Sequence, residues 1–326
     1  MAGLALTRRL PAVLRWGPET HELVAVGLSG HVRVVQDRLV PLLPELTQNQ
    51  LAELVGLDDR GWHRLLADPS AVGLLCAGLG SAEPAATVAA LLDGLRARPG
   101  AMVHGIPVDV SSARTAPVFA RLDAAFDGAA DHGEAELERV GHILRAALGA
   151  AAANEYVESV IVGCVRTISV RRDASRTPSS SSWPPLPGYL RLWNADLGDL
   201  CWTVDALVHE AVHGLLYMIE EQESWFTDRA AWRTSSMRSP WSGRDLPLHS
   251  FVHACFVWFA LLCFWADAEL DGADGMFRQA SKGFESGRLP VLIRSLHTVD
   301  AGVREVLLEL VAQAEQVISC VREPVR

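Results

Sequence analysis

The sequence is poor in basic residues. Lys282 is its only lysine, and the formal net charge is −10. A protein that binds nucleic acid needs clustered lysine and arginine side chains that displace counterions from phosphates. The charge balance therefore argues against a nucleic-acid partner and suits a neutral or basic partner, such as a peptide.

The sequence also lacks the marks of export. Its six cysteines show no CxxC spacing, which predicts reduced core residues of a cytoplasmic protein. The N-terminus carries Arg8 and Arg9 but no long apolar segment or cleavage site typical of a signal peptide. Residues 250–266 hold no formally charged side chain and approach the length of a membrane span. Because His249 and His253 lie at its start, we expect a buried core helix and no membrane association.

The length and composition permit a substantial core, since 49% of the 326 residues are apolar. Apolar residues at helical spacing predominate before residue 98 and over residues 134–153. Residues 157–171 end in an alternating pattern at 167–171 and should become extended there, whether or not they begin as a helix, and residues 188–193 favour a short strand. Residues 209–213 read H-E-x-x-H, a motif typical of metal-binding helices. The predicted fold class is mainly α (α+β), with a helical N-terminal half and a small sheet plus metal-binding helices in the C-terminal half.

Two domains are expected, because the predicted secondary structure changes from helices to a mixture of strands and helices near residue 154. Residues 1–153 would form a helical domain, a possible scaffold that binds a peptide, and residues 154–326 a metal-binding catalytic domain. Residues 177–187, which contain four consecutive serines and four prolines, predict a loop that covers the site.

An H-E-x-x-H motif lies within residues 204–218, whose apolar side chains recur at the spacing of an α-helix. Residues four apart on a helix share one face, so the imidazoles of His209 and His213 can converge on one metal ion. Glu210 is rotated by about 100° from His209. It can stand beside the metal as a base or as an outer hydrogen-bond acceptor.

A catalytic metal needs a third protein ligand and an open position. A metzincin would carry glycine and histidine where this chain has Leu216 and Ile219, so that class is excluded. A glutamate ligand is not expected either, because Glu220, Glu221 and Glu223 lie too close along the same helix.

Four candidates for the third ligand remain, namely Asp228, Asp245, His249 and His253. The two histidines begin a second apolar helix and lie four residues apart on one face. We favour His253.

The helix DALVHEAVHGLLYMIEE followed by SPWSGRDLPLHSFVHACFVWFALLCFW resembles the HExxH-type peptide β-hydroxylases that depend on 2-oxoglutarate. These enzymes are encoded beside ribosomally synthesised natural-product peptides, and the resemblance covers roughly residues 186–267. It implies iron(II), 2-oxoglutarate and O2 as cofactor and cosubstrates, a precursor peptide as partner, and His253 as the third ligand.

A buried cation should meet the far carboxylate of 2-oxoglutarate, and the arginine fork matches a carboxylate with two hydrogen bonds. Arg244, nine residues before His253, is the first candidate and Arg238 the second. His249 would bind cosubstrate or cap its helix, and Asp205 could orient His209.

A zinc metallopeptidase is the alternative function. Three neutral histidines also suit zinc, and Glu210 would then activate a metal-bound water against an amide. If an iron site requires a carboxylate, Asp228 or Asp245 could replace His253. The sequence leaves open which peptide is bound, which metal is held and what the oligomeric state is.

Overall fold

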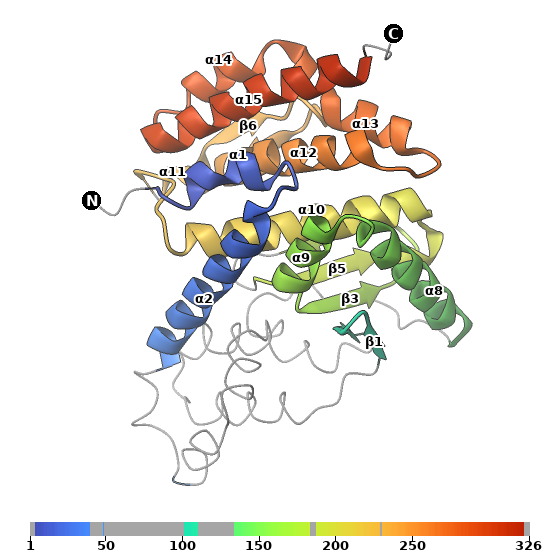
Figure 1. The fold of residues 1–326 in the computed structure, drawn as a ribbon. Coiled ribbons are helices and arrows are strands. Elements are labelled where there is room, and N and C mark those ends of the chain that lie inside the picture. Colours follow the sequence, from blue (N-terminus) through green and yellow to red (C-terminus); the bar gives the residue numbers. More distant parts are fainter. Residues whose placement is uncertain are drawn as a thin grey trace.

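The computed structural model describes residues 4–39, 48, 101–109, 134–182, 187–228 and 230–322. The helices expected in residues 49–98 lie outside these ranges. The described part is predominantly helical with a small mixed sheet, so the predicted class, mainly α with α+β character, is confirmed (Figure 1).

The N-terminal segment packs against the C-terminal half. It forms η1 (Thr7–Arg9), α1 (Leu10–Val13) and α2 (Glu19–Leu39). The carboxylate of Glu223 accepts hydrogen bonds from the backbone N–H groups of Leu6 and Thr7 and from the Thr7 hydroxyl. The separate domain predicted for residues 1–153 stays a prediction, because most of residues 40–133 lie outside the described ranges.

The sheet has the strand order β1-β2-β3-β5-β4. Its strands are β1 (Ala101–Val103), β2 (Ile106–Asp109), β3 (Thr167–Arg171), β4 (Ser179–Ser182) and β5 (Tyr189–Trp193). β3 pairs in parallel with both β2 and β5, whereas β4 pairs antiparallel to β5. The predicted loop at residues 177–187 is therefore wrong for Ser179–Ser182, where β5 supplies backbone hydrogen bonds that serine propensity does not predict.

Helices α8 (Glu134–Ala151) and α9 (Glu155–Cys164) precede β3. The side chain of Asn154 caps α9 by accepting from the N–H groups of Tyr156 and Val157. After β5, the short η4 (Ala195–Leu197) leads to α10 (Leu200–Glu220), whose first turn is capped by Asp199 through the N–H of Trp202.

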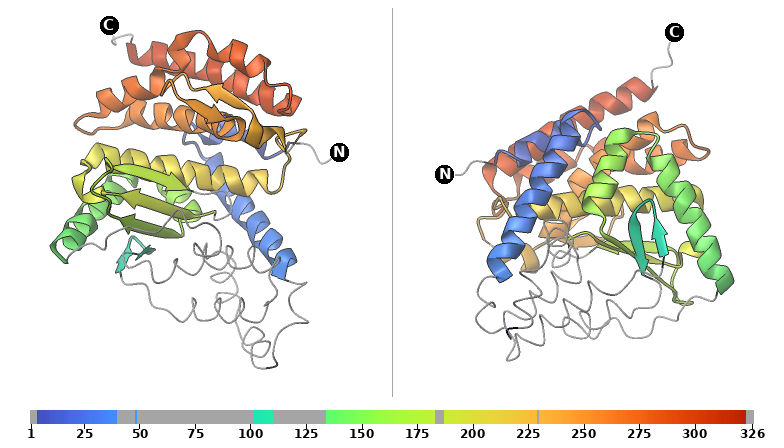
Figure 2. Two further views of the ribbon diagram at one scale, coloured as in Figure 1. Left: turned by 180° about the vertical axis from the view of Figure 1, so that it is seen from behind. Right: turned by 60° about the horizontal axis from the view of Figure 1, so that its bottom comes forward.

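Helix α10 runs between the part that holds the sheet and the part that holds the last helices (Figures 1 and 2). The second part consists of α11 (Ala231–Thr234), β6 (Ser236–Arg238), β7 (Asp245–Pro247), α12 (Leu248–Asp267), α13 (Ala273–Ser281), η5 (Phe284–Ser286), α14 (Leu289–Arg294) and α15 (Ala301–Arg322). Strands β6 and β7 form an antiparallel hairpin that contacts α12.

Helix α12 is the core helix that the uncharged segment predicts. Among the described helices, one is long and apolar enough to cross a membrane, and it is α12. Most of α12 is buried within the fold. It packs against α10, α13 and α15, as expected for a buried core helix.

The cysteines are only partly the core residues that were expected. Cys164, Cys255 and Cys263 are buried, and burial raises the pKa of the Cys164 and Cys263 thiols to about 12. Cys201 is half-buried and Cys320 is exposed; all five are free thiols. Cys76 lies outside the described residues.

Gly214 of α10 tests the packing of α10 on α9, and Gly149 of α8 is the control. A Cβ added at Gly214 would lie 2.9 Å from the backbone carbonyl oxygen of Cys164, whereas a Cβ at Gly149 would meet no atom within 4 Å. We expect Gly214→Ala to destabilise the metal-free protein by about 1–3 kcal/mol, because the two helices must separate. Gly149→Ala should stabilise it by about 0.5–1 kcal/mol through helix propensity. Urea unfolding measures both, and an equal effect of the two substitutions would contradict the close approach.

Candidate metal centre

Helix α10 presents the two histidines of the motif on one face, as predicted. The ring centroids of His209 and His213 lie 5.0 Å apart. Both side chains are only partly exposed, and the apolar residues around them are buried in the core. The helix therefore fixes the spacing of two potential ligands.

Helix α12 presents the second pair. His249 and His253 lie in its first two turns with ring centroids 4.2 Å apart, and His253 is fully buried. The side chain of His249 lies against Trp232, whose ring centroid is 4.6 Å away.

The two helices bring His213 and His253 together, with 3.2 Å between their Nδ1 atoms. Two nitrogen ligands at about 2.0–2.1 Å from one ion lie about 3.0–3.4 Å apart at ordinary coordination angles. The pair therefore fits two ligands of one metal. His209 lies one turn before His213 on α10. The structure brings His213 and His253 together but does not place all three predicted ligands, His209, His213 and His253, within 4.8 Å of one another. We call these three residues the helix group.

Glu220 completes the cluster, although the sequence argument excluded it. Its Oε2 atom lies 2.8 Å from Nε2 of His249 and 3.1 Å from Nε2 of His253. Glu220 follows His213 by seven residues, which is two helical turns, so both side chains share a face. The spacing places Glu220 on the ligand-bearing face of α10, but its partners His249 and His253 lie on α12, which the spacing alone does not show. We call Glu220, His249 and His253 the glutamate triad.

The alternative third ligands Asp228 and Asp245 are exposed in the structure. Asp228 accepts a hydrogen bond from the backbone N–H of Ala230. Among the described residues, the ligand atoms that all lie within 4.8 Å of one another belong to the glutamate triad. Neither aspartate belongs to it.

Burial and neighbouring imidazoles lower the pKa of His213 and of His253, so these two side chains are neutral. Burial, followed by the neighbouring His209, His253 and His249, lowers the His213 pKa well below its ordinary value. Burial and His249 lower the pKa of His253 to about 4. Burial alone would raise the Glu220 pKa, but hydrogen bonds from the two histidines outweigh it and lower the pKa to about 2. Neutral imidazoles and an ionised carboxylate are the forms that bind metals.

The ring orientation of His253 is the one expected of a metal ligand. When Nε2–H donates to the Glu220 carboxylate, the lone pair of Nδ1 faces His213. A carboxylate behind a metal-bound histidine fixes its tautomer and raises its basicity. Glu220 can therefore orient His253 toward the helix group.

Two other carboxylates of α10 are held in place. Glu210 is buried, and its Oε1 atom accepts a hydrogen bond from the Ser180 hydroxyl of β4 at 2.7 Å. Asp205 accepts from the indole N–H of Trp265 at 2.7 Å, and burial raises the pKa of this carboxyl group near His209. The strand β4 thus positions the motif glutamate, a contact that no sequence pattern indicated.

The two candidate arginines lie on the hairpin next to α12. Arg238 ends β6 and Arg244 precedes β7, and both side chains are exposed. The prediction required a buried cation, and neither arginine is buried in this structure. His249, the third residue expected to meet the cosubstrate, hydrogen-bonds Glu220.

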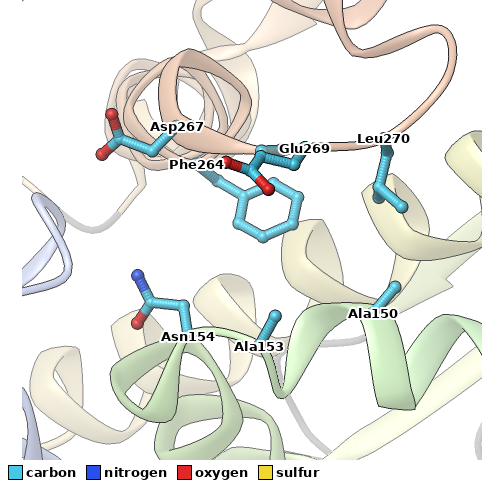
Figure 3. Close-up of a pocket in the computed structure, with 8 residues that line it drawn as sticks. Ala150, Ala153, Asn154, Phe264, Asp267, Glu269 and Leu270 are labelled. Carbon is cyan, nitrogen blue, oxygen red and sulfur yellow. The ribbon is translucent and has the colours of Figure 1, made fainter.

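An open pocket of about 420 Å³ lies elsewhere, beside the far end of α12 (Figure 3). Its lining residues are Ala150, Ala153, Asn154, Phe264, Asp267, Ala268, Glu269 and Leu270. Phe264 follows His253 by eleven residues, or about 16 Å along the helix. This pocket is therefore separate from the histidine cluster.

No protein-family model matches the chain, and no curated protein is a significant match. The resemblance rests on the residues quoted above from the segment 186–267. The activity that it implies is therefore a proposal.

The cluster predicts which histidine matters most for metal binding. Because His253 directs one ring nitrogen to His213 and the other to Glu220, His253→Ala should reduce bound metal to near zero at stoichiometric supply. The exposed His142 of α8 offers a matched control, and His142→Ala should keep the wild-type content. Elemental analysis per chain measures both. Full retention of metal in His253→Ala would show that another residue is the third ligand.

Proposed function

We propose that the protein is an iron(II)- and 2-oxoglutarate-dependent oxygenase of the cytoplasm that hydroxylates the β-carbon of a residue in a ribosomally synthesised peptide. The observation that carries the proposal is the 3.2 Å approach of His213 and His253. The resemblance assigns these two residues to one metal ion. They lie on two different helices, α10 and α12, and the sequence does not show how these helices are oriented toward each other.

The donor set is compatible with iron. His209, His213 and His253 would hold the ion, with the Glu220 carboxylate behind His253. Bound iron(II) with 2-oxoglutarate supplies the oxidation that places one atom of O2 in the peptide and the other in succinate. Aromatic rings of Tyr217 and Trp258 lie against His213 and His209 and limit access of water to these ligands.

The chain's own residues would position the reactants. Glu210, fixed by Ser180, is next to the metal-binding face and would orient ligands through hydrogen bonds. The hairpin of β6 and β7 contacts α12, the helix that carries His249 and His253, so an arginine on this hairpin is our candidate partner for the far carboxylate of the cosubstrate. Arg244 remains our first choice, and it would have to leave solvent on binding, since an unpaired buried carboxylate is costly.

A zinc peptidase is the second candidate, and the environment of Glu210 favours it. A buried glutamate beside two histidines of one helix, held by a hydroxyl group at 2.7 Å, has the setting of a base that activates water. The two functions differ in product, because a peptidase cuts the peptide and an oxygenase keeps its length.

The product distinguishes the two functions directly. With iron(II), O2, 2-oxoglutarate and the peptides encoded nearby, the wild-type protein should form succinate and add one oxygen to one peptide. Mass spectrometry of the peptide and quantification of succinate measure both products. A cut peptide, or no succinate with any such peptide, would show that the hydroxylase assignment is wrong.

Substitution of the motif glutamate gives a second distinction. In an oxygenase, Glu210→Gln should leave metal bound and lower the hydroxylation rate by about 10–100-fold, the usual cost of losing an outer contact. Ser180→Ala, which removes the same contact from the other side, should have a similar but smaller effect. Zinc-dependent hydrolysis that Glu210→Gln abolishes while zinc stays bound would support the peptidase.

The arginine proposed to bind the far carboxylate of 2-oxoglutarate can be tested separately from the metal site. Arg244→Met should raise the 2-oxoglutarate concentration needed for half-maximal rate by about 10-fold or more, because hydrogen bonds to charged groups contribute about 1.5–3 kcal/mol. Iron content should not change. The exposed Arg278 of α13 provides the control, since Arg278→Met should behave as wild type. If Arg244→Met also behaves as wild type, then Arg244 does not bind the far carboxylate of 2-oxoglutarate, and Arg238 is tested next.

A further inference from the structure

The glutamate triad has the geometry of a metal site in its own right. Its Oε2 and Nε2 atoms are 2.8 Å and 3.1 Å apart in the two carboxylate–histidine pairs. Ligand atoms at about 2.0–2.2 Å from one ion are separated by about 2.8–3.4 Å. None of these three ligand atoms belongs to the H-E-x-x-H histidines, and two histidines with one carboxylate suit iron, manganese and zinc.

His253 contributes different ring nitrogens to the two groups. Its Nδ1 faces His213, and its Nε2 faces Glu220. The metal position beside the helix group and the metal position in the glutamate triad therefore lie on opposite sides of the His253 imidazole. With one metal–nitrogen bond on each side, the two ions would be about 6 Å apart. An ion in one position does not fill the other.

The surroundings of the triad suit an ion that enters from solvent. The side chains of His249 and Glu220 are 12% and 15% exposed, whereas His253 is buried. Rings of Trp225, Phe226 and Trp232 pack around the two histidines. This aromatic shell restricts ring rotation, and the exposed edge leaves an entry path.

We propose that Glu220, His249 and His253 form a second transition-metal position that binds an ion without the H-E-x-x-H histidines. When both positions are filled, His253 bridges them and its Nε2 proton is released to solvent. The proposal holds for an oxygenase and for a peptidase, because it concerns metal binding alone.

Cobalt(II) is a suitable probe because stoichiometry and coordination can both be read from its visible spectrum and from elemental analysis. The double variant His209→Ala/His213→Ala removes two members of the helix group and leaves the triad intact. We expect it to bind one cobalt(II) per chain, and adding Glu220→Gln should abolish this binding. Circular dichroism and gel filtration verify the fold of each variant.

A complementary variant keeps the test valid if the double variant does not fold. In the otherwise intact chain, Glu220→Gln/His249→Phe should lower the cobalt(II) content from two ions per chain to one. The inference is overturned if the folded double variant binds no cobalt(II), if Glu220→Gln does not remove its ion, or if the complementary variant keeps the full wild-type content.

Discussion

The contact between α10 and α12 is the constraint on which the candidate site depends. Each helix alone supplies two histidines four residues apart, which is one side of a site. Their packing places His213 and His253 with Nδ1 atoms 3.2 Å apart and brings Glu220 to His249 and His253. A small change in the crossing of the helices would therefore separate the potential ligands of α10 from those of α12.

The rest of the described structure holds these two helices. Gly214 lets α9 approach α10 at the back of the motif, and β4 contacts the motif through Ser180. The N-terminal segment supports the other end, because Thr7 accepts a hydrogen bond from the indole of Trp225, whose ring lies 5.4 Å from His253. Residues distant in sequence thus support the same histidine.

The sequence predicts the parts of the site that depend on one helix. The spacing of His209 and His213 follows from 3.6 residues per turn, and the apolar run after His253 predicts the core helix α12. Glu220 was missed because its partners lie on another helix, and a crossing angle cannot be read from spacing. The strand Ser179–Ser182 was missed because its hydrogen bonds come from β5 and its serines favour turns. The helical fold class was accessible, whereas the long-range pairings were not.

The most direct test of this account is the position of the metal in crystals of iron-loaded protein prepared without oxygen. Anomalous scattering measured at the iron edge locates the ion without reference to activity. The account predicts a strong peak at bonding distance, about 2.0–2.2 Å, from ring nitrogens of both His213 and His253. A peak bonded to neither residue, or no peak between α10 and α12, would contradict it.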